Sequence, residues 1–276
     1  MIVDFHTHIF PDAIAGAAMA KLSENEGGVP HYLNATLSDL LCSMDNAKID
    51  CAVTLPIATR PGQERSILSF SKELLANPRI IPFFSTHPDS PDAVSYIEKA
   101  AAEGLRGIKI HPYYQNTALD DRRYETMAKA ASEAGLIFLT HAGFDPAYPR
   151  QRIADARKVL KLKERVPDLV LIAAHFGGFD DWEGLEMLAG SGVYLDTSFA
   201  LHFFSSEKMS EMILRHGGDY VIFGSDSPWT KQDEELSKIQ SLALDSALID
   251  KIKGGNALRL LKDAADRGIS SCENTY

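Results

Sequence analysis

Eight short apolar runs, separated from one another by helical patterns, constrain the fold of this 276-residue chain more than any other feature. Most of the runs are apolar almost throughout rather than at alternate positions, which is typical of strands buried on both faces. The runs predict strands at residues 2–6, 51–56, 80–86, 105–111, 136–141, 169–175, 193–197 and 220–226.

Apolar residues spaced three or four apart fill the segments between the runs and predict helices. Glycine follows several of these segments, at Gly104, Gly135 and Gly217, where a left-handed C-terminal cap is expected. The predicted helices cover residues 37–47, 64–76, 93–103, 122–134, 153–165, 182–189, 208–215 and 248–261.

The alternation of strand and helix predicts a single (β/α)8 barrel domain over residues 1–276. A doubly wound open sheet is the structural competitor. Such sheets usually have fewer strands and often a glycine-rich first turn, which this chain lacks. Residues 11–36 are the longest stretch without a predicted strand, and we expect them to overhang the mouth of the barrel.

Charge and composition restrict the partners of the protein. The formal net charge is −10, which disfavours nucleic acid and anionic membrane surfaces because both reward clustered Lys and Arg. Three scattered cysteines form neither a disulfide framework nor a thiolate metal site. No secretory signal and no apolar run of roughly 18–20 residues is visible. We expect a cytoplasmic protein that acts on a small molecule, and a homodimer is compatible with a barrel of this size.

Polar side chains gather at the carboxyl ends of the predicted strands, where barrel enzymes place their active sites. Singly, each fits a structural role as well, such as a hydrogen-bonded core histidine or a turn-forming aspartate. Caps and turns do not explain the whole set. Its members are His6 and His8 at the first strand, Lys109 and His111 at the fourth, His141 at the fifth, His175 at the sixth and Asp226 at the eighth.

The spacing of His6 and His8 indicates a metal site, because residues two apart on a strand point to the same face. Two imidazoles so placed can share one cation at about 2.0–2.1 Å from each nitrogen. A third histidine and an aspartate from other strands would complete a nitrogen- and oxygen-rich site. Zinc, manganese or iron suits those ligands.

Five motifs in this order resemble the amidohydrolase superfamily, and more closely the amidohydrolase-related branch described as predicted metal-dependent hydrolases of the TIM-barrel fold. The motifs are DFHTHIFP, GIKIHP, LTHAG, AAHFGG and FGSDSPW, which together span residues 4–229. The resemblance implies a distorted (β/α)8 barrel with metal at its mouth. It also implies that His6, His8, His141 and Asp226 are ligands, and that His175 is a ligand of a second metal or a partner of the water.

One divalent ion, with zinc expected before manganese or iron, is favoured over two. In several two-metal members of the superfamily a carbamylated lysine bridges the metals, and Lys109 resembles that lysine. In many single-metal members of this branch a similar lysine is unmodified. Lys109 and His111 share a face, so either can point inward. A buried lysine with a lowered pKa can accept CO2, bind a substrate carboxylate or hydrogen-bond to its neighbours.

The expected reaction is hydrolysis of an amide, lactone or ester bond of a small, acidic molecule by a metal-activated water. The metal would lower the pKa of that water from about 15.7 towards 7. Asp226 would accept the proton and pass it to the leaving group, and His175 would orient the water. Lys109 or His111 would polarise the scissile carbonyl.

The alternative is a metal-dependent, non-oxidative decarboxylase of a small unsaturated or aromatic acid. Decarboxylases of this branch often carry a glutamate soon after the sixth-strand histidine, in an HxGE pattern. Here His175 is followed by Phe-Gly-Gly at residues 176–178, which favours hydrolysis.

Four residues are expected to contact the substrate: His111, Tyr113, Trp229 and Arg152. The aromatic side chains would supply apolar walls, although packing under long loops explains them equally well. Arg152 can clamp a substrate carboxylate through two parallel hydrogen bonds, unless it is simply solvated like most exposed arginines.

Overall fold

All eight predicted strands form in the computed structural model, which describes residues 1–25, 29–148 and 150–273, with side chains up to residue 267. Each strand is as long as the predicted run or shorter, because the ends of several runs lie in the loops of the mouth. The strands are β1 (Val3–Thr7), β2 (Cys51–Thr54), β3 (Ile80–Pro82), β4 (Gly107–Ile110), β5 (Ile137–Thr140), β6 (Leu171–Ala173), β7 (Tyr194–Asp196) and β8 (Val221–Ile222).

The strands are parallel and form two sheets, ordered β1-β2-β3 and β4-β5-β6-β7-β8. Backbone hydrogen bonds cross both seams between the sheets. Phe84 N donates to Gly107 O (2.9 Å) and Lys109 N donates to Phe84 O (2.7 Å) at one seam. Phe5 N donates to Phe223 O (2.9 Å) at the other. The eight strands therefore form a distorted (β/α)8 barrel, which confirms the predicted fold class.

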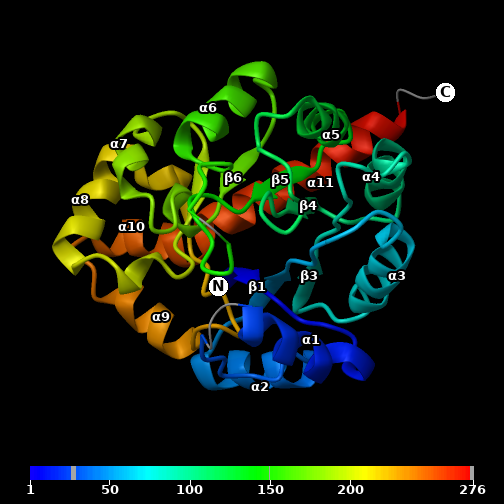
Figure 1. Cartoon of the computed structure of the whole chain (residues 1–276). Coiled ribbons are helices and arrows are strands. Elements are labelled where there is room, and N and C mark those ends of the chain that lie inside the picture. Colours follow the sequence, from blue (N-terminus) through cyan, green and yellow to red (C-terminus); the bar gives the residue numbers. More distant parts are fainter. Residues whose placement is uncertain (26–28, 149, 274–276) are drawn as a thin grey trace.

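Helices surround the strands on the outside, as the view down the barrel in Figure 1 shows. Among the described residues, no helix combines the length and the apolar character needed to cross a membrane. The helices are α1 (Asp12–Asn25), α2 (Leu37–Ala47), α3 (Glu64–Leu74), α4 (Ala93–Ala102), α5 (Arg122–Glu133), α6 (Ala156–Arg165), α7 (Leu185–Leu188), α8 (Ser206–His216), α9 (Gln232–Gln240), α10 (Ser246–Asp250) and α11 (Asn256–Glu273).

Several helix predictions need correction. Helices α1 and α9 were not predicted, because neither carries a strong apolar stripe. Helix α6 begins at Ala156 rather than at residue 153, since the Asp155 side chain accepts the backbone N–H groups of Arg157 and Lys158 and caps the helix there. The predicted helix 182–189 is a 3-10 turn followed by α7. The predicted helix 248–261 is α10, a π-helical turn and α11.

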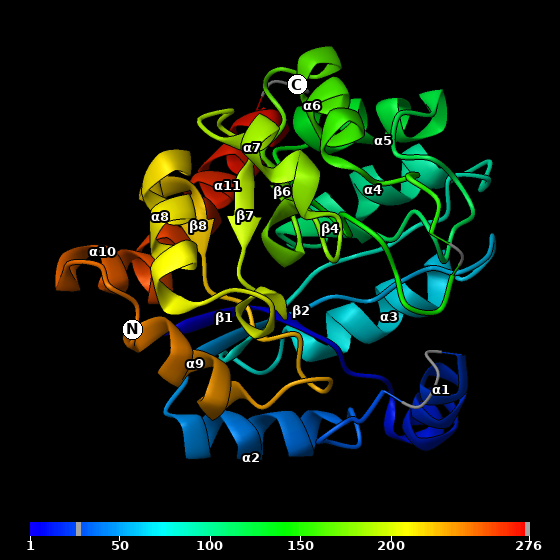
Figure 2. The same cartoon turned by 60° about the vertical axis from the view of Figure 1, so that its left-hand side comes forward.

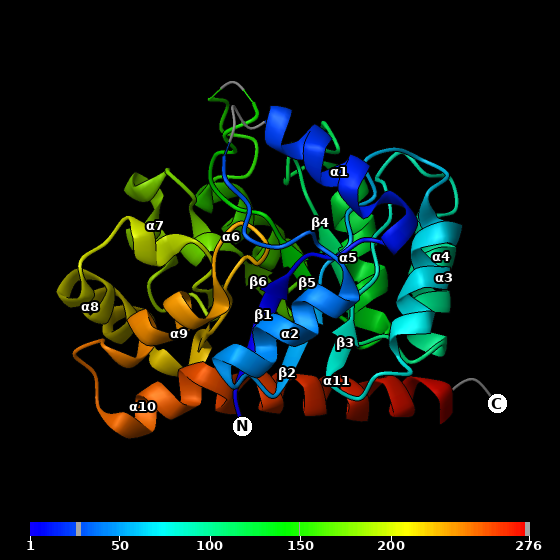
Figure 3. The same ribbon diagram turned by 90° about the horizontal axis from the view of Figure 1, so that it is seen from below.

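The apolar core has two parts, one inside the barrel and one between the strands and the outer helices. The inner part contains residues from the strands, such as Phe5 and Phe83, together with Ala257, Leu260 and Ala264 of α11. Figure 3 shows α11 running across the base of the barrel, close to the N-terminus. In Figure 2, α1 lies apart from the strands, at the edge of the molecule. Helix α11 thus fills the amino-terminal end of the barrel and leaves the opposite end for a site.

Asp4 in β1 fastens this strand to the segment that follows β8. Its buried carboxylate accepts hydrogen bonds from Ser225 N (2.9 Å), Ser225 Oγ (2.6 Å) and Gln232 Nε2 (2.7 Å). Burial raises the pKa of Asp4 to about 6, and the bonds from Gln232 and Ser225 oppose that rise. These contacts fix the position of β1 relative to the loop after β8.

Gly107 at the β3–β4 seam provides a test of how tightly the barrel is packed. A Cβ at this position would lie 2.4 Å from Phe83 Cε2 and 2.7 Å from Ile137 O. We expect Gly107→Ala to lower the free energy of unfolding by about 1–3 kcal/mol through overpacking. Gly16→Ala in α1, where nothing lies within 4 Å, is the control and should leave stability unchanged or raise it by up to about 1 kcal/mol. Urea denaturation measures both, and equal stability of the two variants would contradict the packing argument.

Candidate metal centre

Two imidazoles and one carboxylate meet at the mouth, where the β1 and β8 ends lie side by side. His6 Nε2 is 3.4 Å and His8 Nε2 is 3.3 Å from Asp226 Oδ1. The backbone contributes to this approach, because Asp226 N donates to His6 O (2.9 Å). Gly224 allows it, since a Cβ there would lie 2.8 Å from His6 Cβ. The ligand atoms of His6, His8 and Asp226 all lie within 4.8 Å of one another and form the first cluster.

Hydrogen bonds on the far nitrogen of each imidazole orient the rings of the first cluster. His6 Nδ1 lies 2.8 Å from Asp196 Oδ2, and His8 Nδ1 lies 2.8 Å from Leu55 O. Both oxygens can only accept, so both Nδ1 atoms carry the proton. The Nε2 lone pairs therefore face Asp226, an arrangement found in proteins whose histidines bind metals.

The electrostatics of the first cluster favour an ionised carboxylate at Asp226 and disfavour a second proton on His6. Burial acts to raise the pKa of Asp226, but His6, His8 and His175 outweigh it and hold that pKa far below its usual value. Burial lowers the pKa of His6 well below its usual value, and the nearby Lys109 lowers it further, whereas Asp226 opposes the shift. The two groups are thus in the protonation states that a divalent cation requires.

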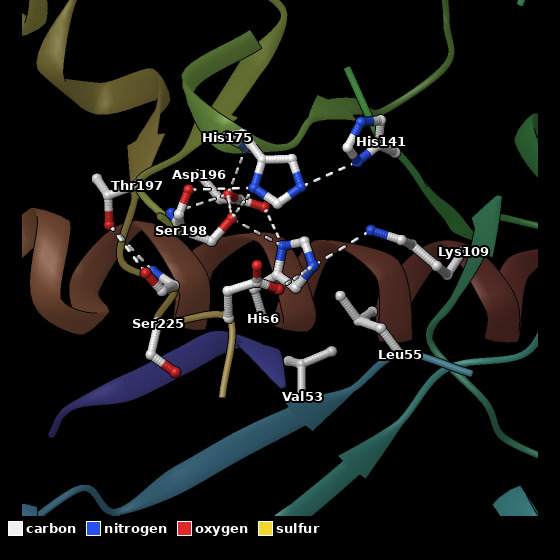
Figure 4. A network of polar contacts seen from close by, with 12 residues as sticks. His6, Val53, Leu55, Lys109, His141, His175, Asp196, Thr197, Ser198 and Ser225 are labelled. Atoms are coloured by element: carbon white, nitrogen blue, oxygen red, sulfur yellow. Dashed lines mark hydrogen bonds and ion pairs between the residues drawn. The ribbon is translucent and has the colours of Figure 1, made fainter. Parts of the chain in front are cut away.

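Lys109 of β4 points across the barrel towards the first cluster (Figure 4). Its Nζ lies 3.2 Å from His6 Nε2, and the residue is 1% exposed. Burial lowers the pKa of Lys109 to about 8, against the raising effect of Asp196 and Asp226. The sequence left open whether Lys109 or His111 points inward at this level, and Lys109 is the one that reaches the first cluster.

His141 and His175 contact each other rather than completing the first cluster. His175 Nε2 lies 3.1 Å from His141 Nδ1 (Figure 4), and the His175 and His6 rings lie 5.2 Å apart between centroids. His141 Nε2 donates to Phe144 O (2.7 Å). The structure therefore places His175 between His6 and His141, and His141 lies outside the first cluster.

A second group that could hold a cation contains His111, His141 and Asp145, all buried and with ligand atoms within 4.8 Å of one another. His111 Nε2 lies 3.4 Å from Asp145 Oδ2. Burial raises the pKa of Asp145 to about 6, so this carboxylate gives up its proton less readily than Asp226. The His111 ring stacks on His141 (centroids 4.2 Å apart) and on Tyr114 (4.1 Å). With its stacked rings and its less acidic carboxylate, this group is the weaker candidate.

The remaining predicted substrate contacts, Tyr113, Trp229 and Arg152, each have partners within the chain. The Tyr113 hydroxyl donates to Gly143 O (2.8 Å) and its ring meets His141 edge-on. Trp229 N donates to Asp226 O (2.9 Å) and its ring contacts an exposed histidine, His31. Arg152 differs most from expectation, because its guanidinium pairs with Glu183 (2.9 Å) and Asp181 (3.2 Å) at the surface.

Three polar residues of the centre were not predicted: Asp145, Asp196 and Ser198. Asp196 ends β7, so the strand-end rule that singled out the histidines could have found it. Ser198 lies two residues further along, and its hydroxyl is 3.0 Å from Nδ1 of both His6 and His175. Asp145 lies in a loop, and nothing in its sequence context signalled burial.

The donor set of the first cluster fits a divalent transition metal. Two imidazole nitrogens without protons and an ionised carboxylate are ligands that zinc, manganese and iron accept. All three side chains are at least half buried, and no side-chain ammonium other than Lys109 contacts the cluster among the described residues.

Solved structures with a similar fold include both decarboxylases and a hydrolase. 5-Carboxyvanillate decarboxylase from Sphingomonas paucimobilis has a TM-score of 0.72 at 16% identity, over 95% of this chain and 98% of that chain. A dihydroxybenzoic acid decarboxylase from Polaromonas, with bound manganese, has a TM-score of 0.71 at 15% identity, over 95% and 96%. A probable 2-pyrone-4,6-dicarboxylic acid hydrolase from Acinetobacter baumannii has a TM-score of 0.67 at 14% identity, over 95% and 99%. At these identities the similarity is evidence of the fold.

No curated protein sequence matches the chain. A family model described as amidohydrolase matches residues 3–262, which include all eight strands and the whole candidate centre. Together with the barrel and the histidines at its mouth, this match shows that the chain belongs to the amidohydrolase family.

Proposed function

We propose that the protein is a divalent-metal-dependent decarboxylase of small aromatic or unsaturated carboxylic acids. The observation that carries the proposal is the first cluster, in which two imidazole lone pairs and an ionised carboxylate converge beside a buried lysine. Most of the similar structures are decarboxylases of aromatic acids, which supports this reaction over hydrolysis. This reverses the preference drawn from the sequence.

His6, His8 and Asp226 would hold the metal, with His175 beside them. They are three of the ligands expected from the sequence, whereas His141 lies in the second group. When bound, a divalent ion supplies positive charge that stabilises negative charge on an oxygen of the substrate. Manganese is as suitable as zinc for this donor set, and a similar decarboxylase structure contains manganese. The centre is proposed to hold one ion.

Lys109 would bind the substrate carboxylate. With a pKa of about 8 it is mostly protonated at pH 7, and burial strengthens its attraction to an anion. The His111 ring is stacked between Tyr114 and His141, so its edge rather than its face would be available to a substrate.

Asp226 would act as the proton carrier. In decarboxylation the bond from the ring carbon to the carboxylate breaks, CO2 leaves, and a proton must be delivered to the same carbon. Asp226 lies against both imidazoles at the mouth, where it can take a proton from a substrate hydroxyl or water and pass it on. His175 would orient the reacting group from the other side of His6.

Hydrolysis of a lactone, ester or amide is the second candidate. The glutamate that decarboxylases of this branch often carry after the sixth-strand histidine is absent, since Gly178 stands at that place. One similar structure is a probable pyrone dicarboxylic acid hydrolase. The same Asp226 would then accept a proton from the attacking water.

The two reactions differ in isotope incorporation. We expect the manganese-loaded protein to release CO2 from a dihydroxybenzoate or from 5-carboxyvanillate, and to place one deuterium on the product ring in D2O, with no ¹⁸O from labelled water. Asp226→Asn should lower kcat by about 100-fold or more, since the proton carrier is lost. Mass spectrometry of the product reads both labels. Turnover of 2-pyrone-4,6-dicarboxylate with ¹⁸O in the product and no CO2 would instead establish hydrolysis.

Removal of one ligand should weaken metal binding without unfolding the barrel. We expect His8→Ala to lower the affinity for Mn²⁺ at least about tenfold, because one of three ligands is lost. His202→Gln is the control, since His202 is an exposed histidine outside both groups that pairs with Glu235 (2.8 Å). Titration of free Mn²⁺ by electron paramagnetic resonance measures the affinities. Equal affinity of His8→Ala and the wild type would rule out the first cluster as the metal site.

A further inference from the structure

Asp196 is a buried carboxylate to which the proposed reaction assigns no step, and its two oxygens have different partners. Oδ2 faces His6 Nδ1 at 2.8 Å. Oδ1 accepts the backbone N–H groups of His175 (3.0 Å) and Ser198 (3.1 Å), and it also contacts the Ser198 hydroxyl. Figure 4 shows this carboxylate between the two histidines. All three of these groups donate to Oδ1.

We propose that Asp196 is a positioning residue that holds His6 in the tautomer with its proton on Nδ1, and so keeps the His6 Nε2 lone pair open for a divalent cation. The inference rests on the metal dependence proposed above. It does not depend on whether the reaction is decarboxylation or hydrolysis.

The contacts of His6 on both nitrogens agree with this tautomer. A carboxylate oxygen only accepts, so His6 Nδ1 must donate to Asp196. On the other side, the Lys109 ammonium only donates and lies 3.2 Å from His6 Nε2, so Nε2 must accept. The Lys109 ammonium thus lies on the side of His6 Nε2 where a metal ion would bind, and both are positively charged.

The ring nitrogens of His175 have partners other than the Asp196 carboxylate. Its Nδ1 lies 3.1 Å from the Ser198 backbone oxygen, and its Nε2 lies 3.1 Å from His141 Nδ1. Asp196 accepts the backbone N–H of His175, and within the described part of the chain its carboxylate makes no hydrogen bond to the His175 ring. A change at Asp196 should therefore switch the tautomer of His6 and leave that of His175 intact.

Asp196→Asn separates the role in tautomer choice from a role in packing, because the two side chains have nearly the same shape. The amide oxygen must take the place of Oδ1, where three donors converge, so the amide NH2 must face His6 Nδ1. It then donates to Nδ1 and forces the His6 proton onto Nε2, where the cation would bind. In serine proteases, replacing the aspartate that orients the catalytic histidine by asparagine lowers activity in the same way, because the histidine takes the wrong tautomer.

The test is ¹⁵N NMR of metal-free protein labelled on histidine, in which the two tautomers give different nitrogen shifts. His6 is assigned by the signal that disappears in His6→Gln. We expect Nδ1–H on His6 in the wild type and Nε2–H in Asp196→Asn, with His175 unchanged. Mn²⁺ affinity of Asp196→Asn should fall by about 10–100-fold.

Ser198→Ala is the matched control, because it removes a hydroxyl from the same network and leaves the Asp196–His6 bond in place. It should keep Nδ1–H on His6 and an Mn²⁺ affinity within a few fold of the wild type. An unchanged His6 tautomer or unchanged Mn²⁺ affinity in folded Asp196→Asn would overturn the proposal. If Asp196→Asn does not fold, the spectrum of the wild type decides. A proton on Nε2 of His6 in the wild type would also overturn the proposal.

The outcome is separable from that of the proposed function. A wild-type protein that binds no Mn²⁺ would count against the metal-dependent reaction. The tautomer of His6 in the wild type and in Asp196→Asn would still decide whether Asp196 positions this imidazole.

Discussion

The seam between β8 and β1 is the constraint on which the rest of the centre depends. Three residues of β1 and its extension alternate along one strand: Asp4 binds the loop after β8, His6 accepts a backbone hydrogen bond from Asp226, and His8 faces the Asp226 carboxylate. The first and last strands of the barrel, together with the residues that directly follow them, thus supply the whole first cluster. The hydrogen bonds that join β8 to β1 therefore also bring the residues of the candidate metal site together.

The charged groups at the mouth are buried, so they are stabilised by one another rather than by water. Burial alone would neutralise Asp226, Asp196 and Lys109, and it shifts the pKa of Asp196 and Lys109 in that direction. Asp226 alone is driven the other way, because His6, His8 and His175 surround it. The mouth therefore combines one strongly acidic carboxylate with three histidines whose pKa values burial lowers, His6, His141 and His175. A divalent cation would supply the positive charge that this arrangement favours.

The sequence predicted the parts of this molecule that local periodicity determines. Buried parallel strands are continuous apolar runs, so all eight were found, and the strand-end rule placed His6, His8 and Asp226 at one mouth. Helix α1 was missed because it lies at the edge of the molecule and buries only Ala15 and Met19. The partners of Arg152 and the pairing of His141 with His175 depend on loop geometry, which has no periodic signal. The role of each predicted site residue stays a prediction until it is tested.

The position of α11 has a consequence for how the chain acquires its structure during synthesis. The strands β1 to β8 precede α11 in the chain, yet Ala257, Leu260 and Ala264 of that helix belong to the core inside the barrel. A nascent chain that has just finished β8 still exposes apolar strand surface at the base. We therefore expect the barrel to reach its native structure only after the C-terminal helix has left the ribosome. Before that point, the exposed apolar surface should favour chaperone binding.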